Sequence, residues 1–130
     1  MHEIAINTNI YPNEKEGDLE YCNGSVGSCI MNEIKAYMER NGFCCERVMQ
    51  EDYGWGFYVK INNRKIWMDT SCAVGGSEKN PEMDLYYLRC KHEPGFNIFE
   101  WFRLDSGRIA EDVAFKILNN WIIEKKFDFE

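Results

Sequence analysis

Hydrophobic and polar residues alternate with two different periods along the chain. Apolar residues at helical spacing predict a first helix, which begins near residue 26 and ends before Asn41-Gly42. Ser25 is a suitable cap for its start. A second apolar stripe predicts a final helix that begins at Asp105 or Ser106 and runs to about Glu124. The two stripes are Val26, Ile30, Ile34, Tyr37 and Met38, and then Ile109, Val113, Ile117, Leu118, Trp121 and Ile122.

Period-two patterns predict the strands. Residues 2–9 are expected to form an edge strand, and residues 43–50, 55–61, 65–72 and 84–92 a four-stranded antiparallel meander. Trp55, Phe57 and Val59 fall on one face of the strand at 55–61, which is therefore the core face. Gly56 lies on the opposite face, where its missing side chain leaves room for a cross-strand aromatic such as Trp67.

These elements define the fold class. Their order is β-α-β-β-β-β-α, with a short aromatic segment at 96–102 before the last helix. Packing both helices on one face of a four- to five-stranded antiparallel sheet buries both apolar stripes, so the class is α+β. The chain has 130 residues and no linker or internal repeat, which favours one globular domain over residues 1–130.

Charge limits the partners that this domain can bind. Asp and Glu number 22 against 15 Lys and Arg, giving a net charge of −7. This excess disfavours direct binding to nucleic-acid phosphates or to anionic membranes, and a basic protein is the natural complement. Neither a signal peptide nor a run of about 20 apolar residues is visible. We therefore expect a cytoplasmic protein without a membrane segment.

The six cysteines are expected to be reduced, because no secretion signal accompanies them. Cys90 and His92 have a permissible spacing for two metal ligands. Cys22 and Cys29 are seven residues apart, however, and Cys44-Cys45 point to opposite faces, so paired zinc ligands are missing. No metal and no cofactor are predicted.

One catalytic alternative remains. Cys72 ends a strand among small residues, and His92 is a candidate base for its thiol. The competing interpretation is a buried cysteine before the Gly75-Gly76 turn. The sequence favours the second interpretation, and we assign no catalytic residue, although a carboxylate pair needs no fixed spacing and stays open.

Acidic residues supply a candidate interface. Four carboxylates occupy alternate positions before the first helix, and in an extended segment they would line one side at about 6.8 Å intervals. Such a row resembles a series of phosphates and suits a groove lined by arginine or lysine. The alternative is a solvated loop. The row consists of Glu14, Glu16, Asp18 and Glu20, and Glu51 and Asp52 are predicted to add to the same acidic surface.

Residues 96–102 carry four aromatic side chains, too many for one narrow face of a strand. Phe99 and Trp101 are the candidate interface anchors, since aromatic residues are enriched among interface hot spots. Closing the core beside the last helix is the alternative for the segment.

Together these features favour a small acidic protein inhibitor that blocks a basic partner, either a nuclease or a nucleic-acid-binding complex. Two settings fit this description: an anti-defence protein such as an anti-CRISPR, and an immunity protein that neutralises a toxin. A small cysteine-dependent enzyme using Cys72 and His92 is one alternative. A homo-oligomeric adaptor, for example a homodimer pairing through 96–102, is another.

Overall fold

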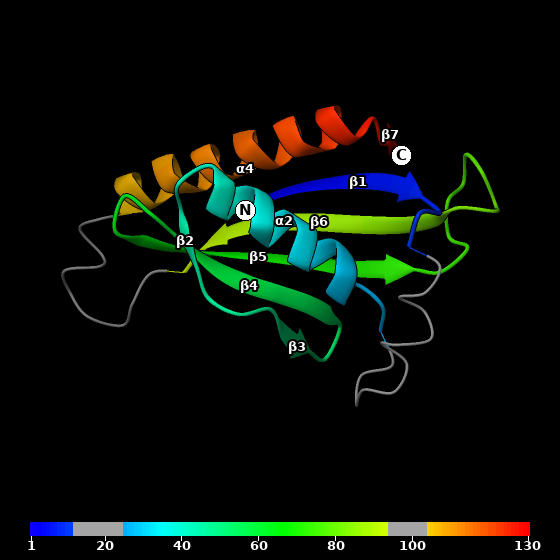
Figure 1. Ribbon diagram of the computed structural model, residues 1–130, viewed down its shortest axis with the longest axis horizontal. Helices are drawn as coiled ribbons and strands as arrows, with labels where there is room; N and C mark the ends of the chain where they lie inside the picture. The colour runs from blue at the N-terminus through cyan, green and yellow to red at the C-terminus, as the bar shows by residue number, and fades with distance from the viewer. Residues whose placement is uncertain (12–24, 94–103) are drawn as a thin grey trace.

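The computed structural model of the chain describes residues 1–11, 25–93 and 104–130 (Figure 1). The fold is α+β, as predicted, and the described residues form two helices and a seven-stranded antiparallel sheet. The elements in chain order are β1 (His2–Thr8), α2 (Ser28–Arg40), β2 (Cys44–Cys45), β3 (Met49–Glu51), β4 (Gly54–Ile61), β5 (Arg64–Ala73), β6 (Asp84–His92), α4 (Leu104–Lys125) and β7 (Asp128–Phe129).

The sheet is built around the predicted meander. Its order is β2-β4-β5-β6-β1-β7, and β3 also pairs with β4. Strand β1 returns to lie antiparallel to β6 along its whole length, from His2 opposite Cys90 to Thr8 opposite Asp84. On its other side β1 pairs with β7 only at Ile6 and Asn7. Strand β1 is therefore the outermost long strand, which is close to the expected edge position.

The predicted count of four to five strands was too low, for two reasons. The expected strand at 43–50 is split, because Cys45 pairs with Val59 and Met49 pairs with Gly56. Four steps on one strand then face three on the other, which is the signature of a β-bulge. Strand β7 was missed because its two residues are too short to carry a periodicity.

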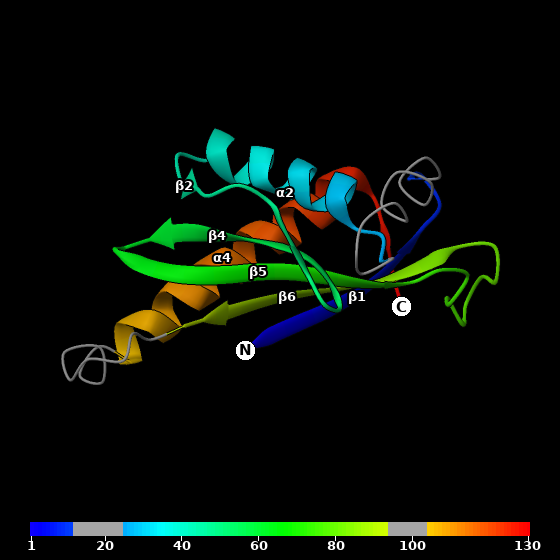
Figure 2. The same ribbon diagram turned by 90° about the horizontal axis from the view of Figure 1, so that it is seen from below.

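Both helices cover the same face of the sheet (Figure 2). Helix α2 buries Ile30, Ile34 and Met38 against this face. The strands contribute their alternate positions, including Phe57 and Val59, which are fully buried. The prediction of two helices on one face is confirmed, and neither α2 nor α4 covers the opposite face of the sheet.

The predicted stripe on α4 was partly wrong. Ile109 is 58% exposed, and the fully buried positions in the first half of the helix are Ala110 and Ala114. Leu118 and Trp121 are buried as expected. Because alanine side chains are small, the backbone of α4 can lie close to the sheet at these two positions. The contact with the sheet is therefore made by Ala110 and Ala114, where larger aliphatic residues were expected. No helix among the described residues has the length and apolar character needed to cross a membrane.

Candidate functional site on the open face of the sheet

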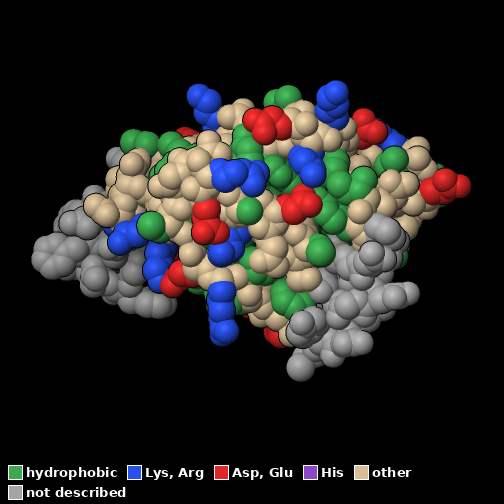
Figure 3. Space-filling model, in the orientation of Figure 1, with side chains coloured by type: hydrophobic (Ala, Val, Ile, Leu, Met, Phe, Trp, Pro, Cys, Tyr) green, Lys and Arg blue, Asp and Glu red, His purple; other side chains and the backbone are tan. Residues whose placement is uncertain are grey.

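We call the side of the sheet away from α2 and α4 the open face. Antiparallel sheets commonly pack one face on a core and expose the other. Register brings charged residues of three strands together on this face, since Asp69 of β5 lies opposite Arg89 of β6, and Arg89 lies opposite Glu3 of β1. The helix-covered side, in contrast, shows basic and acidic side chains interspersed over its surface (Figure 3).

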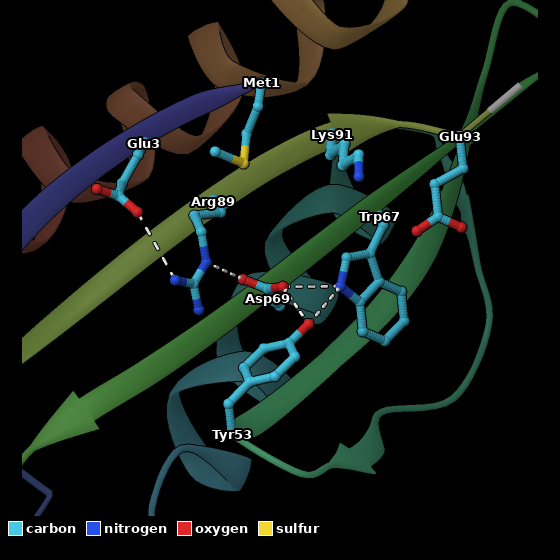
Figure 4. A pocket seen from close by; sticks show the side chains of 8 residues that line it. All are labelled: Met1, Glu3, Tyr53, Trp67, Asp69, Arg89, Lys91 and Glu93. Atoms are coloured by element: carbon cyan, nitrogen blue, oxygen red, sulfur yellow. Dashed lines mark hydrogen bonds and ion pairs between the residues drawn. The ribbon is translucent and has the colours of Figure 1, made fainter.

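Asp69 is the centre of a hydrogen-bonded network on the open face (Figure 4). Its Oδ2 accepts hydrogen bonds from the Tyr53 hydroxyl at 2.7 Å and from Trp67 Nε1 at 2.8 Å. Its Oδ1 accepts one from Arg89 Nε at 2.6 Å. Asp69 is only 5% exposed. Three donors, one of them charged, provide the compensation that a buried carboxylate requires.

Arg89 connects this network to two further elements. Its Nη1 lies 3.7 Å from the Glu3 carboxylate, an ion pair without a close hydrogen bond. Its guanidinium lies 5.3 Å from the centroid of the Tyr53 ring, within the range of a cation–π interaction. Nη2 is buried and has no hydrogen-bond partner.

Trp67 lies flat against strand β4 at Gly56, as the sequence predicted. A Cβ atom placed on Gly56 would lie 2.4 Å from Cζ2 of Trp67 and 2.7 Å from the carbonyl oxygen of Met68. The ring of Tyr58 closes the other side, with its centroid 4.8 Å from that of Trp67. Trp67 is therefore 6% exposed although it projects from the face opposite α2 and α4.

A pocket of about 310 Å³ lies beside this network (Figure 4). It is at the lower end of the volume range of small-ligand sites, so it suits a small group or one long side chain. Tyr53 forms part of its wall and is 47% exposed, while the Tyr53 hydroxyl is held by Asp69. The lining residues are Met1, Glu3, Tyr53, Trp67, Asp69, Arg89, Lys91 and Glu93.

Two tyrosines at this face have pKa values raised to about 12. For Tyr53 the main cause is burial, followed by the hydrogen bond to Asp69. For Tyr58 the main cause is the hydrogen bond to Glu93, 2.6 Å long, followed by burial. In both cases a carboxylate accepts a hydrogen bond from the phenolic hydroxyl, so deprotonation of the tyrosine would place two negative charges side by side.

We expect Tyr53 and Tyr58 to ionise about two pH units above an ordinary tyrosine. Because both folded pKa values are raised from 10.0 to about 12, the stabilisation they give is complete below pH 10 and is lost as the pH rises towards 12. Ultraviolet absorbance titration of the tyrosines, with unfolding curves over the same pH range, measures both effects. Tyr53→Phe and Tyr58→Phe should each remove one late step, and simultaneous ionisation of all tyrosines near pH 10 would contradict the assignment.

The predicted partner-binding residues fall into two groups. Glu51 ends β3 and Asp52 begins the turn to β4, and both are exposed next to Tyr53. Their contact with a partner stays a prediction. The remaining predicted residues lie outside the described part of the chain, and these are Glu14, Glu16, Asp18, Glu20, Phe99 and Trp101.

The proposed pairing of Cys72 with His92 was wrong. Cys72 lies opposite Tyr86, whereas His92 lies opposite Ile66 at the other end of β5. Six residues along a strand correspond to roughly 20 Å, far beyond hydrogen-bond reach. The His92 ring instead lies against Gly107 of α4, where an added Cβ would be 2.1 Å away. His92 is thus a packing residue beneath the helix.

Two further cysteines, Cys45 and Cys90, lie in surroundings that disfavour a reactive thiol. Burial is the main cause that raises the pKa of the Cys90 thiol, with a further contribution from Glu111, and burial likewise raises that of Cys45 to about 11. Both shifts disfavour the thiolate that nucleophilic attack requires. Within residues 1–11, 25–93 and 104–130, no group of three or more His, Cys, Asp or Glu side chains is arranged to hold a metal ion.

The Asp69 network itself was not predicted from the sequence. Asp69 and Arg89 both stand at open-face positions of their strands, but their pairing depends on the register of β5 against β6, which the intervening loop of residues 74–83 conceals. One signal was present in the sequence. Asp69 stands inside a strand with hydrophobic residues, and a buried polar residue there needs a hydrogen-bond partner.

Comparison with known proteins adds no relative. No protein-family model matches the chain, and neither a curated protein nor a solved structure shows significant similarity to it. What the chain and its α+β fold contain is therefore the whole basis for a functional proposal.

Proposed function

We propose that this protein is a small acidic inhibitor that binds and blocks a basic, nucleic-acid-handling protein. The target is a nuclease toxin or a nucleic-acid-binding defence complex, so the biological role is that of an immunity protein or an anti-defence protein such as an anti-CRISPR. The observation that carries the proposal is the combination of a net charge of −7 with a sheet face that neither α2 nor α4 covers and that presents carboxylates beside tyrosine rings.

The chemistry of this face supports protein binding. Protein interfaces combine aromatic anchors with a polar rim, and Tyr53 and Tyr87 are large exposed aromatics at 47% and 36%. Glu51, Asp52 and Glu93 are exposed around Tyr53 and Tyr58. Acidic groups at such a rim accelerate association with a basic surface and repel nucleic acid, which competes for the same surface.

Affinity capture from the native host tests this proposal. The tagged protein is used as bait at low and at high salt, and the captured protein is then assayed for nucleic-acid binding or cleavage with increasing amounts of the inhibitor. We expect one basic protein that is lost at high salt and whose activity is blocked at equimolar inhibitor. A captured partner whose activity on nucleic acid is unchanged at saturating inhibitor would overturn the proposal.

Charge reversal at the turn before β4 is expected to weaken this complex. Replacing both Glu51 and Asp52 with lysine should reduce affinity at least about tenfold, because two attractive rim charges become repulsive. The melting temperature should change little, since both side chains are exposed. Glu78→Lys combined with Glu82→Lys, at two exposed positions of the β5–β6 loop, changes the net charge by the same amount and is the matched control. Equal affinities of the native and doubly reversed proteins would remove the turn from the interface.

A further inference from the structure

We propose that the open-face pocket receives one arginine or lysine side chain of the basic partner, with the cation placed against Glu93. This inference rests on the proposed function and specifies how the partner is recognised. It is carried by the charge balance of the pocket, by the way the tyrosines of the open face already bind cations of this chain, and by the unequal pairing of the pocket's carboxylates.

The charge balance favours a cation. The pocket is lined by the carboxylates of Asp69, Glu3 and Glu93, by the cations of Arg89 and Lys91, and by Met1. The ammonium group of Met1 is itself compensated, because it pairs with Glu111 at 2.8 Å. Glu51 and Asp52 flank Tyr53 at the same face and increase the acidic excess. An incoming carboxylate or phosphate would face this excess, whereas a guanidinium or ammonium group would be attracted by it.

The tyrosines of this face already bind two basic side chains of the protein itself. Arg89 lies over the Tyr53 ring at 5.3 Å, and Lys65 Nζ lies over the Tyr58 ring at 5.1 Å. Each ring hydroxyl donates to a carboxylate, Asp69 for Tyr53 and Glu93 for Tyr58. Tyr53 is the one of the two that lines the pocket, and its ring can contact a further cation at a low entropic cost because its own side chain is already ordered.

The carboxylates of the pocket are not equally compensated. Asp69 is paired with Arg89 at 2.6 Å, and Glu3 lies 3.7 Å from the same guanidinium. Glu93 accepts the Tyr58 hydroxyl, and it has no basic side chain within 4.0 Å among the residues that the structure describes. The pKa of Tyr58 is raised first by the hydrogen bond to Glu93, and the charges of Glu51 and Glu46 contribute less. Glu46 is paired with Lys65 at 3.5 Å, so Glu93 is the acidic centre of this corner. A partner cation gains most by pairing there.

Lys91 makes the proposal specific. It lies two residues before Glu93 on β6, lines the same pocket and is exposed. Its charge opposes an incoming cation, so its removal should tighten binding. An anion-binding pocket would show the opposite response, because Lys91 would then be its most accessible cation.

The first test uses a defined probe and does not require the partner. The isotope-labelled protein is titrated with Gly-Arg-Gly, with Gly-citrulline-Gly as the neutral isostere and with Gly-Glu-Gly as the anion, and the Trp67 indole N–H and the Glu93 amide are followed by NMR. We expect a saturable shift with the arginine peptide alone. An equal response to the citrulline peptide, or a response to the glutamate peptide in its place, would overturn the proposal.

Variants locate the cation. Glu93→Gln should weaken binding of the arginine peptide about threefold and Lys91→Gln should tighten it about threefold, as expected for single partly exposed charges. Glu82→Gln and Lys116→Gln carry the same charge changes at exposed positions outside the pocket and should leave binding unchanged. Equal effects of the pocket and control variants would mean that only net charge matters, and the pocket assignment would then fail.

The same four variants are then measured against the captured partner. A salt-sensitive basic partner that binds native protein and Glu93→Gln equally would leave the proposed function intact and remove the pocket from it. If the pocket binds the arginine peptide specifically but the protein blocks no nucleic-acid-handling target, the pocket assignment stands and the proposed function fails. The two failures are therefore distinguishable.

Discussion

Replacing Asp69 with alanine is expected to lower the free energy of unfolding by about 3 kcal/mol, as expected when one partner of a buried ion pair is removed. The substitution leaves the Arg89 guanidinium without its 2.6 Å partner and removes the acceptor of the Tyr53 hydroxyl and of Trp67 Nε1. The Arg89 side chain is 22% exposed, so water compensates part of the loss and the effect falls at the lower end of the range for buried pairs. Urea unfolding of the native and variant proteins measures it.

Two further variants test whether the loss of stability comes from the network or from the removal of any carboxylate. Asp52→Ala removes an exposed carboxylate nearby and should change stability by less than about 0.5 kcal/mol. Adding Arg89→Met to Asp69→Ala removes the uncompensated charge and should restore part of the stability. If Asp69→Ala and Asp52→Ala are equally stable, the network does not stabilise the sheet.

This network also explains why the segment 51–59 combines acids, aromatics and glycines. Trp55, Phe57 and Val59 face the helices and are buried, as their period-two spacing predicted. Tyr53 folds back from the turn to reach Asp69 across the open face. Asp69 and Arg89 hold the Tyr53 side chain in place. Glu51 and Asp52 directly precede Tyr53 in the chain, so they are next to an anchored residue. A turn that is anchored in this way loses little entropy when it binds a partner.

The sequence predicted those parts of the fold that depend on local periodicity. Strand β6 was placed at its observed bounds, and the cores of α2, β4 and β5 were found because their apolar spacing is regular. The prediction failed in the first half of α4, where the buried positions hold small residues and a large aliphatic residue is exposed. Ala110 and Ala114 make the contact there, and Ile109 is exposed. It failed again at the bulge between Cys45 and Met49, which a strand pattern does not encode.

The candidate site was less predictable, because it depends on contacts between distant residues. Asp69 meets Arg89 and Glu3 through strand pairings that span more than half of the chain. The same pairings separate Cys72 from His92, which seemed compatible when only their chemistry was considered. Gly56 was the exception, because a glycine among aromatic residues in a strand is itself a local sign that another group approaches closely.

Replacing Gly56 with alanine is accordingly expected to destabilise the protein by about 2–3 kcal/mol, in the range of overpacked interiors. The added methyl carbon would lie 2.4 Å from Trp67 Cζ2 and 2.7 Å from the Met68 carbonyl oxygen, so the indole and the β5 backbone must both move. Moving Trp67 also lengthens its hydrogen bond to Asp69, which couples the packing of β4 to the polar network. Urea unfolding measures the loss, and the Trp67 indole N–H resonance reports the displacement.

Trp67→Phe replaces the clashing ring with a smaller one, so the double variant with Gly56→Ala should lose less stability than the sum of the two single variants. Strict additivity would mean that the Trp67 ring does not pack on Gly56.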